Sequence, residues 1–144
     1  MNISFRRPRE IRVLLVEDND IYAGAVQLLL ESVERAEVVG RARDGAQGVE
    51  LALELSPDCI LMDISMPVMD GFEATRILRK LLPGVRIVML TSSDDPGDRA
   101  QAEAAGADGY LTKESRLEEL AAAVTGAARE RPFVSRAALA VAAA

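Results

Sequence analysis

The chain has 144 residues, which suits a single domain with one buried core. It contains no histidine and one cysteine, so the sequence excludes Ser-His-Asp and Cys-His catalysis, zinc sites with histidine ligands and disulfides within the chain. Its formal net charge of −6 opposes direct binding of this segment to a nucleic acid backbone.

Short apolar runs alternate with helical patterns from Ile11 to about Ala128. The runs VLLV and CILM are apolar at every position, which is typical of strands covered on both faces of a parallel sheet. Helices between the strands would give five βα units, an α/β sandwich with right-handed crossovers. The predicted strands are Ile11–Val16, Val38–Ala42, Cys59–Met62, Arg86–Leu90 and Tyr110–Leu111.

Two of the predicted helices differ in their apolar surface. The helix at Pro96–Ala105 has alanines as its only apolar side chains, so it would bury little area and be weakly anchored. It is either an ordinary surface helix or an element able to shift. The first helix, in contrast, has an apolar face of the kind that packs on a core, formed by Ile21, Ala25, Leu28, Leu29 and Val33.

Most of the later helices carry capping signals. Asp95 before Pro96 predicts an N-cap followed by proline at the first helical position, and Gly106 predicts a stop. Capping boxes are predicted for three other helices, at Asp44 with Gln47, Asp70 with Glu73 and Ser115 with Glu118.

The two ends of the chain differ from its centre. Residues 1–10 form an extension with three arginines, and the apolar run after it is too short for a secretion signal. In residues 129–144, Pro132 interrupts the last helical pattern and Ser135 could cap a new, alanine-rich segment. This indicates a frayed tail or a linker. No apolar stretch approaches the roughly 20 residues that cross a bilayer. We therefore expect a cytoplasmic protein without membrane contact, which also suits the single cysteine.

Polar side chains follow four of the predicted strands. In open α/β sheets, ligands bind outside the carboxyl ends of the strands at a topological switch point. The side chains placed there are Glu17 and Asp18 after VLLV, Asp63 after CILM, Thr91 after IVML, and Lys113 just after the last strand. They can therefore converge although they are far apart in the sequence.

Three carboxylates in one site repel one another unless a cation is bound. Oxygen ligands without histidine or cysteine indicate magnesium, calcium or manganese, and magnesium suits phosphoryl transfer. Asp63 would be the nucleophile, because a carboxylate can form an aspartyl phosphate. Lys113 would neutralise charge on the phosphoryl oxygens, and the Thr91 hydroxyl would donate a hydrogen bond to one of them. Taken singly, each residue is an ordinary cap, turn or surface residue, so the ordered set carries the prediction.

The segments VLLVEDND, CILMDISMPVMDG, IVMLTSSD and GADGYLTKES resemble the receiver domain of two-component response regulators. The resemblance covers about residues 11–128 and implies the flavodoxin-like (βα)5 fold with a five-stranded parallel sheet of order 2-1-3-4-5. It makes Asp63 the phosphoacceptor and a sensor histidine kinase the partner. It also implies that Asp18 and Asp63 ligate Mg²⁺ directly with the backbone carbonyl of Ser65, while Glu17 acts through water.

The resemblance also identifies the residues that would respond to phosphorylation. Thr91 matches the switch hydroxyl, Lys113 the lysine of the site, and Tyr110 the aromatic ring whose inward or outward rotamer accompanies activation. Receivers often have a cis proline after the lysine, where this chain has Glu114. The form GYLTKES and the tail 129–144 are similar to the subfamily whose receivers precede a LuxR-type helix-turn-helix domain. A missing output domain of that kind would bind DNA.

These features favour a signalling domain that catalyses only its own phosphorylation and dephosphorylation and forms a homodimer on activation. One alternative is a Mg²⁺-dependent aspartyl-phosphate phosphatase. Such enzymes carry a second acidic residue two positions after the nucleophile, where this chain has Ser65. The other alternative is a receiver-like interaction module that works without phosphorylation, against which the full acidic set with Thr91 and Lys113 argues.

Overall fold

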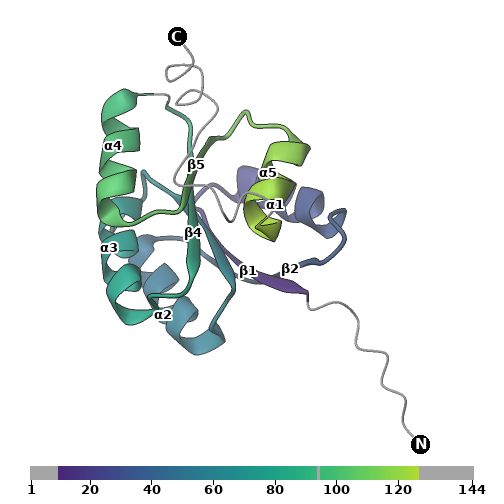
Figure 1. Ribbon diagram of the computed structural model, residues 1–144, viewed down its shortest axis with the longest axis horizontal. Helices are drawn as coiled ribbons and strands as arrows, with labels where there is room; N and C mark the ends of the chain where they lie inside the picture. Colours follow the sequence, from purple (N-terminus) through teal and green to yellow (C-terminus); the bar gives the residue numbers. More distant parts are fainter. Residues whose placement is uncertain (1–9, 94, 127–144) are drawn as a thin grey trace, which may run out of the picture.

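The computed structural model describes residues 10–93 and 95–126. The five strands pair in parallel in the order β2-β1-β3-β4-β5, which confirms the flavodoxin-like α/β fold. Strands and helices alternate strictly along this part of the chain (Figure 1). They are β1 (Ile11–Val16), α1 (Asp20–Glu31), β2 (Ala36–Ala42), α2 (Gly45–Leu55), β3 (Cys59–Asp63), α3 (Gly71–Leu81), β4 (Arg86–Thr91), α4 (Pro96–Ala105), β5 (Gly109–Thr112) and α5 (Leu117–Thr125).

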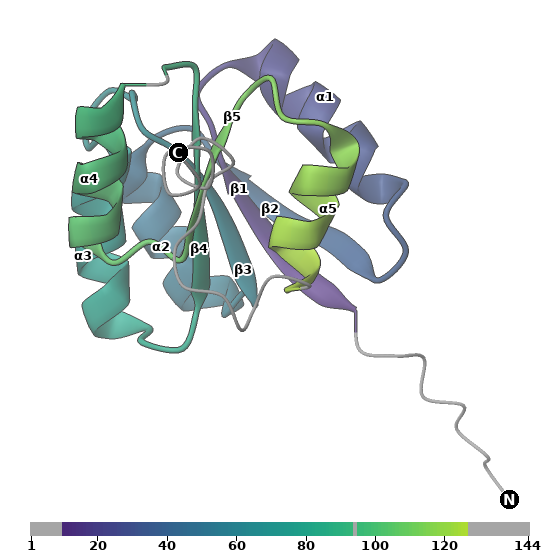
Figure 2. The same cartoon turned by 45° about the horizontal axis from the view of Figure 1, so that its top comes forward.

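The sheet separates two apolar cores. Helices α2, α3 and α4 cover one face, and α1 and α5 cover the other, as the two views in Figures 1 and 2 show. Side chains of β1 alternate between the cores, with Leu14 and Val16 in the first and Val13 and Leu15 in the second. All four are fully buried, which explains why the run VLLV is apolar at every position.

The predicted inward face of α1 was wrong. Ala23, Val26 and Leu30 pack on the sheet, whereas Ile21 is 86% exposed and Leu28 is 70% exposed. The helix is apolar on most of its circumference, so its periodicity does not select one face.

The capping predictions divide into correct and incorrect ones. Asp44, Asp70 and Asp95 each accept a hydrogen bond from a backbone N–H in the first turn of α2, α3 and α4. Gly106 ends α4 with a φ of 102°, a conformation that glycine adopts without strain. The box at Ser115 was wrong, because α5 begins after Arg116 and has no side-chain cap.

Smaller differences concern strand ends and the carboxyl-terminal segment. Strand β2 begins at Ala36 rather than Val38, because an edge strand tolerates the polar Glu37 within its ladder. Among the described residues no peptide bond is cis, and this includes Lys113-Glu114.

No helix in the described ranges is both long and apolar enough to span a bilayer. The extension at 1–9 and the tail predicted at 129–144 lie outside the described residues.

Candidate functional site

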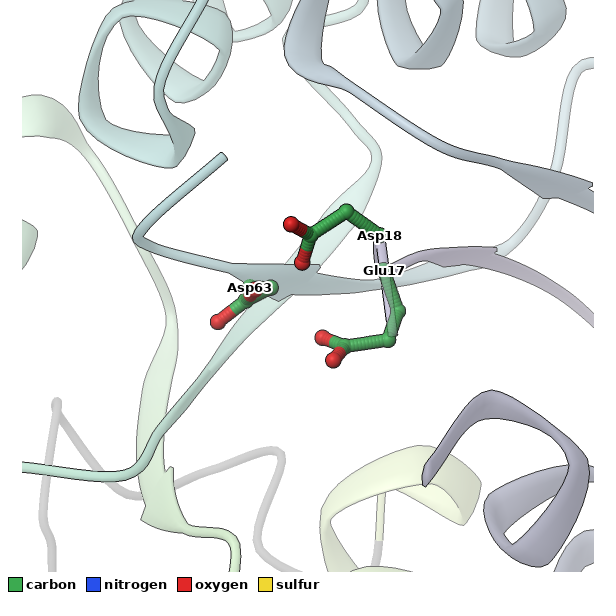
Figure 3. Close-up of side chains that lie close together, drawn as sticks. All are labelled: Glu17, Asp18 and Asp63. Carbon is green, nitrogen blue, oxygen red and sulfur yellow. The ribbon is translucent and has the colours of Figure 1, made fainter. Parts of the chain in front are cut away.

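Three acidic side chains meet at the carboxyl ends of β1 and β3. The two strands are paired so that Val16 lies beside Met62, which places Glu17 next to Asp63. Carboxylate oxygens of Glu17, Asp18 and Asp63 all lie within 4.8 Å of one another (Figure 3). Glu17 and Asp63 are buried, at 1% and 5% exposure, while Asp18 is exposed at the rim. The structure thus brings together the acidic set that the sequence predicted.

Lys113 joins this cluster from the loop after β5. Its Nζ lies 2.7 Å from Oε1 of Glu17 and 3.4 Å from Oδ1 of Asp63. Its backbone N–H donates to the carbonyl oxygen of Thr91, 2.8 Å away, which ties the loop to the end of β4. One ammonium group therefore contacts both buried carboxylates.

Close packing of the backbone supports the loop that follows Asp63. The N–H of Gly71, the first residue of α3, donates to the carbonyl oxygen of Ile64 at 2.8 Å. A Cβ at Gly71 would overlap the carbonyl oxygen of Asp63, so only glycine permits this approach. The Ile64 N–H in turn donates to Oδ1 of Asp63 at 2.9 Å and orients its carboxylate.

The electrostatics of the cluster leave Asp63 poised between its two protonation states. Burial, reinforced by the charge of Glu17, raises the pKa of Asp63 to about 7, although Lys113 acts in the opposite direction. Burial lowers the pKa of Lys113, but its hydrogen bond to Glu17 and the charge of Asp63 outweigh this, so the net shift is upward. Lys113 is therefore a permanent cation beside a carboxylate that needs more positive charge to stay ionised.

The donor set fits a hard divalent cation. Oε2 of Glu17 is buried, and among the described residues no group donates a hydrogen bond to it. Such an atom is costly unless it faces a cation or water. A pocket of about 540 Å³ opens beside the cluster and is lined by Asp18, Ser65 and Asp98, among others. Oxygen ligands from carboxylates and a pocket open to solvent are what Mg²⁺ uses in proteins.

Thr91 and Tyr110 lie at the same edge of the sheet and are linked through Ser93. Thr91 directly follows Leu90, the register partner of Asp63. The buried hydroxyl of Thr91 accepts a hydrogen bond from the Ser93 N–H at 3.0 Å. The Tyr110 hydroxyl donates to the Ser93 carbonyl oxygen at 3.2 Å, and its ring is 1% exposed. The aromatic ring of Tyr110 therefore points into the protein.

Two residues near the cluster were not predicted from the sequence. Arg41, at the end of β2, donates through Nε and Nη2 to the carbonyl oxygen of Glu17 at 3.3 and 3.0 Å, and pairs with Asp20 at 2.8 Å. The ring of Tyr22, on α1, lies under Nζ of Lys113. Neither residue follows the strand-end pattern, because Arg41 lies within β2 and Tyr22 lies inside a helix.

The chain is similar to known proteins along most of its length. Residues 13–125 match the family model of the response regulator receiver domain. The transcriptional regulatory protein LiaR of Bacillus subtilis is 43% identical over 122 residues, which are 85% of this chain and 58% of LiaR. The response regulator GacA of Pseudomonas aeruginosa is 39% identical over 114 residues, 79% of this chain and 53% of GacA. The chain thus spans about half the length of the curated relatives it matches.

Solved structures show the same fold. A two-component response regulator of the LuxR family from an Aurantimonas species matches with a TM-score of 0.84 and 31% identity, covering 91% of this chain and 94% of that one. The signal receiver domain of NarL from Mycobacterium tuberculosis matches with a TM-score of 0.81 and 33% identity, covering 86% and 100%. Because the family model spans most of the sequence and the acidic cluster lies within it, this chain belongs to the response regulator receiver domain family.

Proposed function

We propose that Asp63 accepts a phosphoryl group from the phosphohistidine of a sensor kinase in the cytoplasm. The observation that carries this proposal is the contact of one buried carboxylate with Lys113 Nζ at 3.4 Å, inside a cluster of three carboxylates. A carboxylate oxygen of Asp63 forms the new bond to phosphorus, while the bond from phosphorus to the histidine nitrogen breaks. The histidine that this chain lacks belongs to the donor.

The residues around Asp63 would divide the work of stabilising the transferred group. Lys113 neutralises negative charge on the phosphoryl oxygens, and the Thr91 hydroxyl can donate to one of them once it turns toward Asp63. Mg²⁺, held by Asp18, Asp63 and the backbone carbonyl of Ser65, with Glu17 acting through water, would supply the remaining charge neutralisation. The unpartnered Oε2 of Glu17 supports a role for this residue beside the ion.

The contacts of Ser93 offer a route from phosphorylation to a conformational change. A phosphoryl group adds about 1.5 to 2 negative charges and strong acceptor oxygens. If Thr91 turns toward them, its hydrogen bond with the Ser93 N–H is lost, and the loop that also accepts from Tyr110 is released. Helix α4 follows this loop and buries only Ala102 and Ala105, so it resists displacement weakly. We propose that this surface changes on activation and supports a homodimer.

Helix α1 offers a docking surface for the kinase. Its exposed residues Ile21 and Leu28 form an apolar stripe on a helix that begins two residues after Asp18, at the mouth of the site. An exposed apolar stripe beside a reactive group indicates a protein contact. Replacing both residues by serine should slow transfer from a histidine kinase that phosphorylates the wild-type chain, and leave phosphorylation by acetyl phosphate unchanged. An equal loss with both donors would contradict this surface.

The output of the domain is a further part of the proposal. The relatives are about twice as long as their matched segments, and one of the solved structures is described as a DNA-binding response regulator of the LuxR family from Staphylococcus aureus. We propose that this receiver controls a DNA-binding domain of that kind. The phosphatase alternative is weakened because Ser65 is exposed and non-acidic where a second acid would be needed.

Acetyl phosphate with Mg²⁺ tests the proposal directly. The wild-type chain should gain one phosphoryl group by intact mass spectrometry, and Asp63→Asn should gain none. Asp44→Asn is the matched control, because asparagine caps a helix as well as aspartate does and this cap lies outside the cluster. Phosphorylation of Asp63→Asn at the wild-type rate would overturn the proposal. Multiple turnover of p-nitrophenyl phosphate would favour the phosphatase, and phosphorylation-independent function would be indicated if neither reaction occurred.

A further inference from the structure

We infer that Tyr22 is a positioning residue for Lys113, which it holds in place through the face of its ring. This inference rests on the proposed phosphoacceptor function. The ring centroid of Tyr22 lies 4.7 Å from Nζ of Lys113, within the range of a cation–π interaction. The same ammonium group contacts Glu17 and Asp63, so the ring is a third neighbour of Nζ beside the two carboxylates.

A lysine side chain needs such support to act at a defined point. Its charge sits at the end of four flexible methylene groups, and fixing it costs conformational entropy. The two carboxylates attract Nζ, but a transferred phosphoryl group would compete with both of them for it. An aromatic face attracts the cation without offering a proton acceptor, so it can hold Lys113 near the site before and after the transfer.

The ring itself is held by the start of α1. Asn19 caps this helix, and its Oδ1 accepts a hydrogen bond from the Tyr22 N–H at 2.9 Å. The ring is half-buried and packs against the core beneath α1 and α5. Because the capped helix start holds its backbone and the core packs against its side chain, the ring is preorganised to receive Lys113.

Two variants separate the ring face from the rest of the side chain. Tyr22→Phe keeps the aromatic face and removes the hydroxyl, whereas Tyr22→Leu keeps apolar packing and removes the face. With acetyl phosphate and Mg²⁺, Tyr22→Phe should be phosphorylated at the wild-type rate, and Tyr22→Leu about three- to tenfold more slowly, as expected for loss of one cation–π interaction. Gln27→Ala, an exposed change on the same helix, is the control for a general effect on α1.

A second readout follows Lys113 itself. Protons over an aromatic face are shifted upfield, so the Lys113 Cε–H signals in ¹H–¹³C spectra should be shifted in the wild type and in Tyr22→Phe, and return toward ordinary values in Tyr22→Leu. In a Lys113→Met background, Tyr22→Leu should slow phosphorylation no further, because the two changes remove the same contact.

Three results would overturn the inference. The first is a wild-type phosphorylation rate together with an unchanged Lys113 signal in Tyr22→Leu, and the second is a phosphorylation rate in Tyr22→Phe that falls as much as in Tyr22→Leu. The third is that Tyr22→Leu slows phosphorylation by the same factor in the Lys113→Met background as in the wild type. The last result would mean that Tyr22 acts only through packing. If the wild-type chain is not phosphorylated on Asp63, the proposed function fails, whereas the Lys113 signals still report whether Tyr22 positions the ammonium group.

Discussion

Charged side chains are arranged in opposite ways at the amino ends and at the carboxyl ends of the strands. At the amino ends, Arg79 donates four hydrogen bonds: to the carbonyl oxygens of Gly106, Pro83 and Val85, and to a carboxylate oxygen of Asp108. The same oxygen of Asp108 accepts from the N–H of Ile87. These groups connect α3, the end of α4 and the starts of β4 and β5.

At the carboxyl ends, negative charges are crowded together and are only partly compensated. Three carboxylates lie close together, one ammonium group contacts two of them, and Oε2 of Glu17 has no hydrogen-bond donor among the described residues. The loop after Asp63 also contains backbone strain. Val68 has a φ of 69°, and the N–H of Met69 donates to the carbonyl oxygen of Pro67 at 2.7 Å, which closes a strained γ-turn around a β-branched residue.

The difference shows how one scaffold separates stability from function. Hydrogen-bonded charges at the amino ends hold the helices to the sheet, while crowded carboxylates at the carboxyl ends store free energy that a cation or a phosphoryl group can release. Substitutions should therefore have opposite signs at the two ends. Those at the amino ends should destabilise the protein, and some at the carboxyl ends should stabilise it at the expense of function.

The largest effect is expected at Arg79. Arg79→Met keeps much of the apolar stem but removes all four hydrogen bonds, three of them to partly buried acceptors, so the free energy of unfolding should fall by about 3 kcal/mol. Denaturation in urea measures this change. Arg76→Met, an exposed position on the same helix, should change it by less than about 0.5 kcal/mol. Similar values for the two variants would show that the amino-end network is not a main source of stability.

Asp63→Asn should change the free energy of unfolding in the opposite direction and stabilise the protein. The pKa of Asp63 is near 4 when unfolded and about 7 when folded, so the unfolded chain binds fewer protons between these values and stability falls as pH rises. Without divalent cations, the substitution should therefore raise the free energy of unfolding by about 2 kcal/mol at pH 8, and by almost nothing below pH 4. A stabilisation that does not depend on pH would show that ionisation of Asp63 is not its cause.

Divalent cations should reduce the repulsion among the carboxylates at the carboxyl ends of the strands. At a Mg²⁺ concentration ten times its dissociation constant, the wild-type chain should gain about 1.4 kcal/mol in free energy of unfolding. Asp63→Asn should gain much less, because the substitution removes one of the three carboxylates. Thermal unfolding with and without Mg²⁺, with EDTA as the reference, measures both effects. An equal gain in the two proteins would place the ion elsewhere.

The smallest effect is expected at Val68. Glycine adopts a positive φ without strain, and Val68 is 83% exposed, so Val68→Gly loses little packing. The substitution relieves the strain in the folded state, but it also raises the conformational entropy of the unfolded chain. The net effect should be a stabilisation of about 0.5 kcal/mol. Val68→Ala is the control, since alanine keeps the Cβ and should gain less. A destabilised Val68→Gly would show that the γ-turn is not under strain.

Local signals in the sequence were reliable where the chemistry is local. The caps at Asp44, Asp70 and Asp95 were correct because each bonds to a backbone N–H only two or three residues away. The box at Ser115 failed even though its spacing fits, since the turn after Lys113 delays the start of α5. The inward face of α1 failed for another reason. A helix with apolar residues around most of its circumference can be oriented only by what it packs against.

The five βα units and the meeting of the acidic residues follow from the order of residues along the chain. Apolar runs define the strands, and parallel strands necessarily bring Asp18, Asp63 and Lys113 to one edge of the sheet. Three other features could be seen only once the chain was folded. Glu17 is buried against Lys113 while Asp18 stays exposed, the pKa of Asp63 rises to about 7, and Tyr22 lies under the ammonium group. These features depend on distances of a few ångströms between segments far apart in the chain, and no spacing within the sequence specifies them.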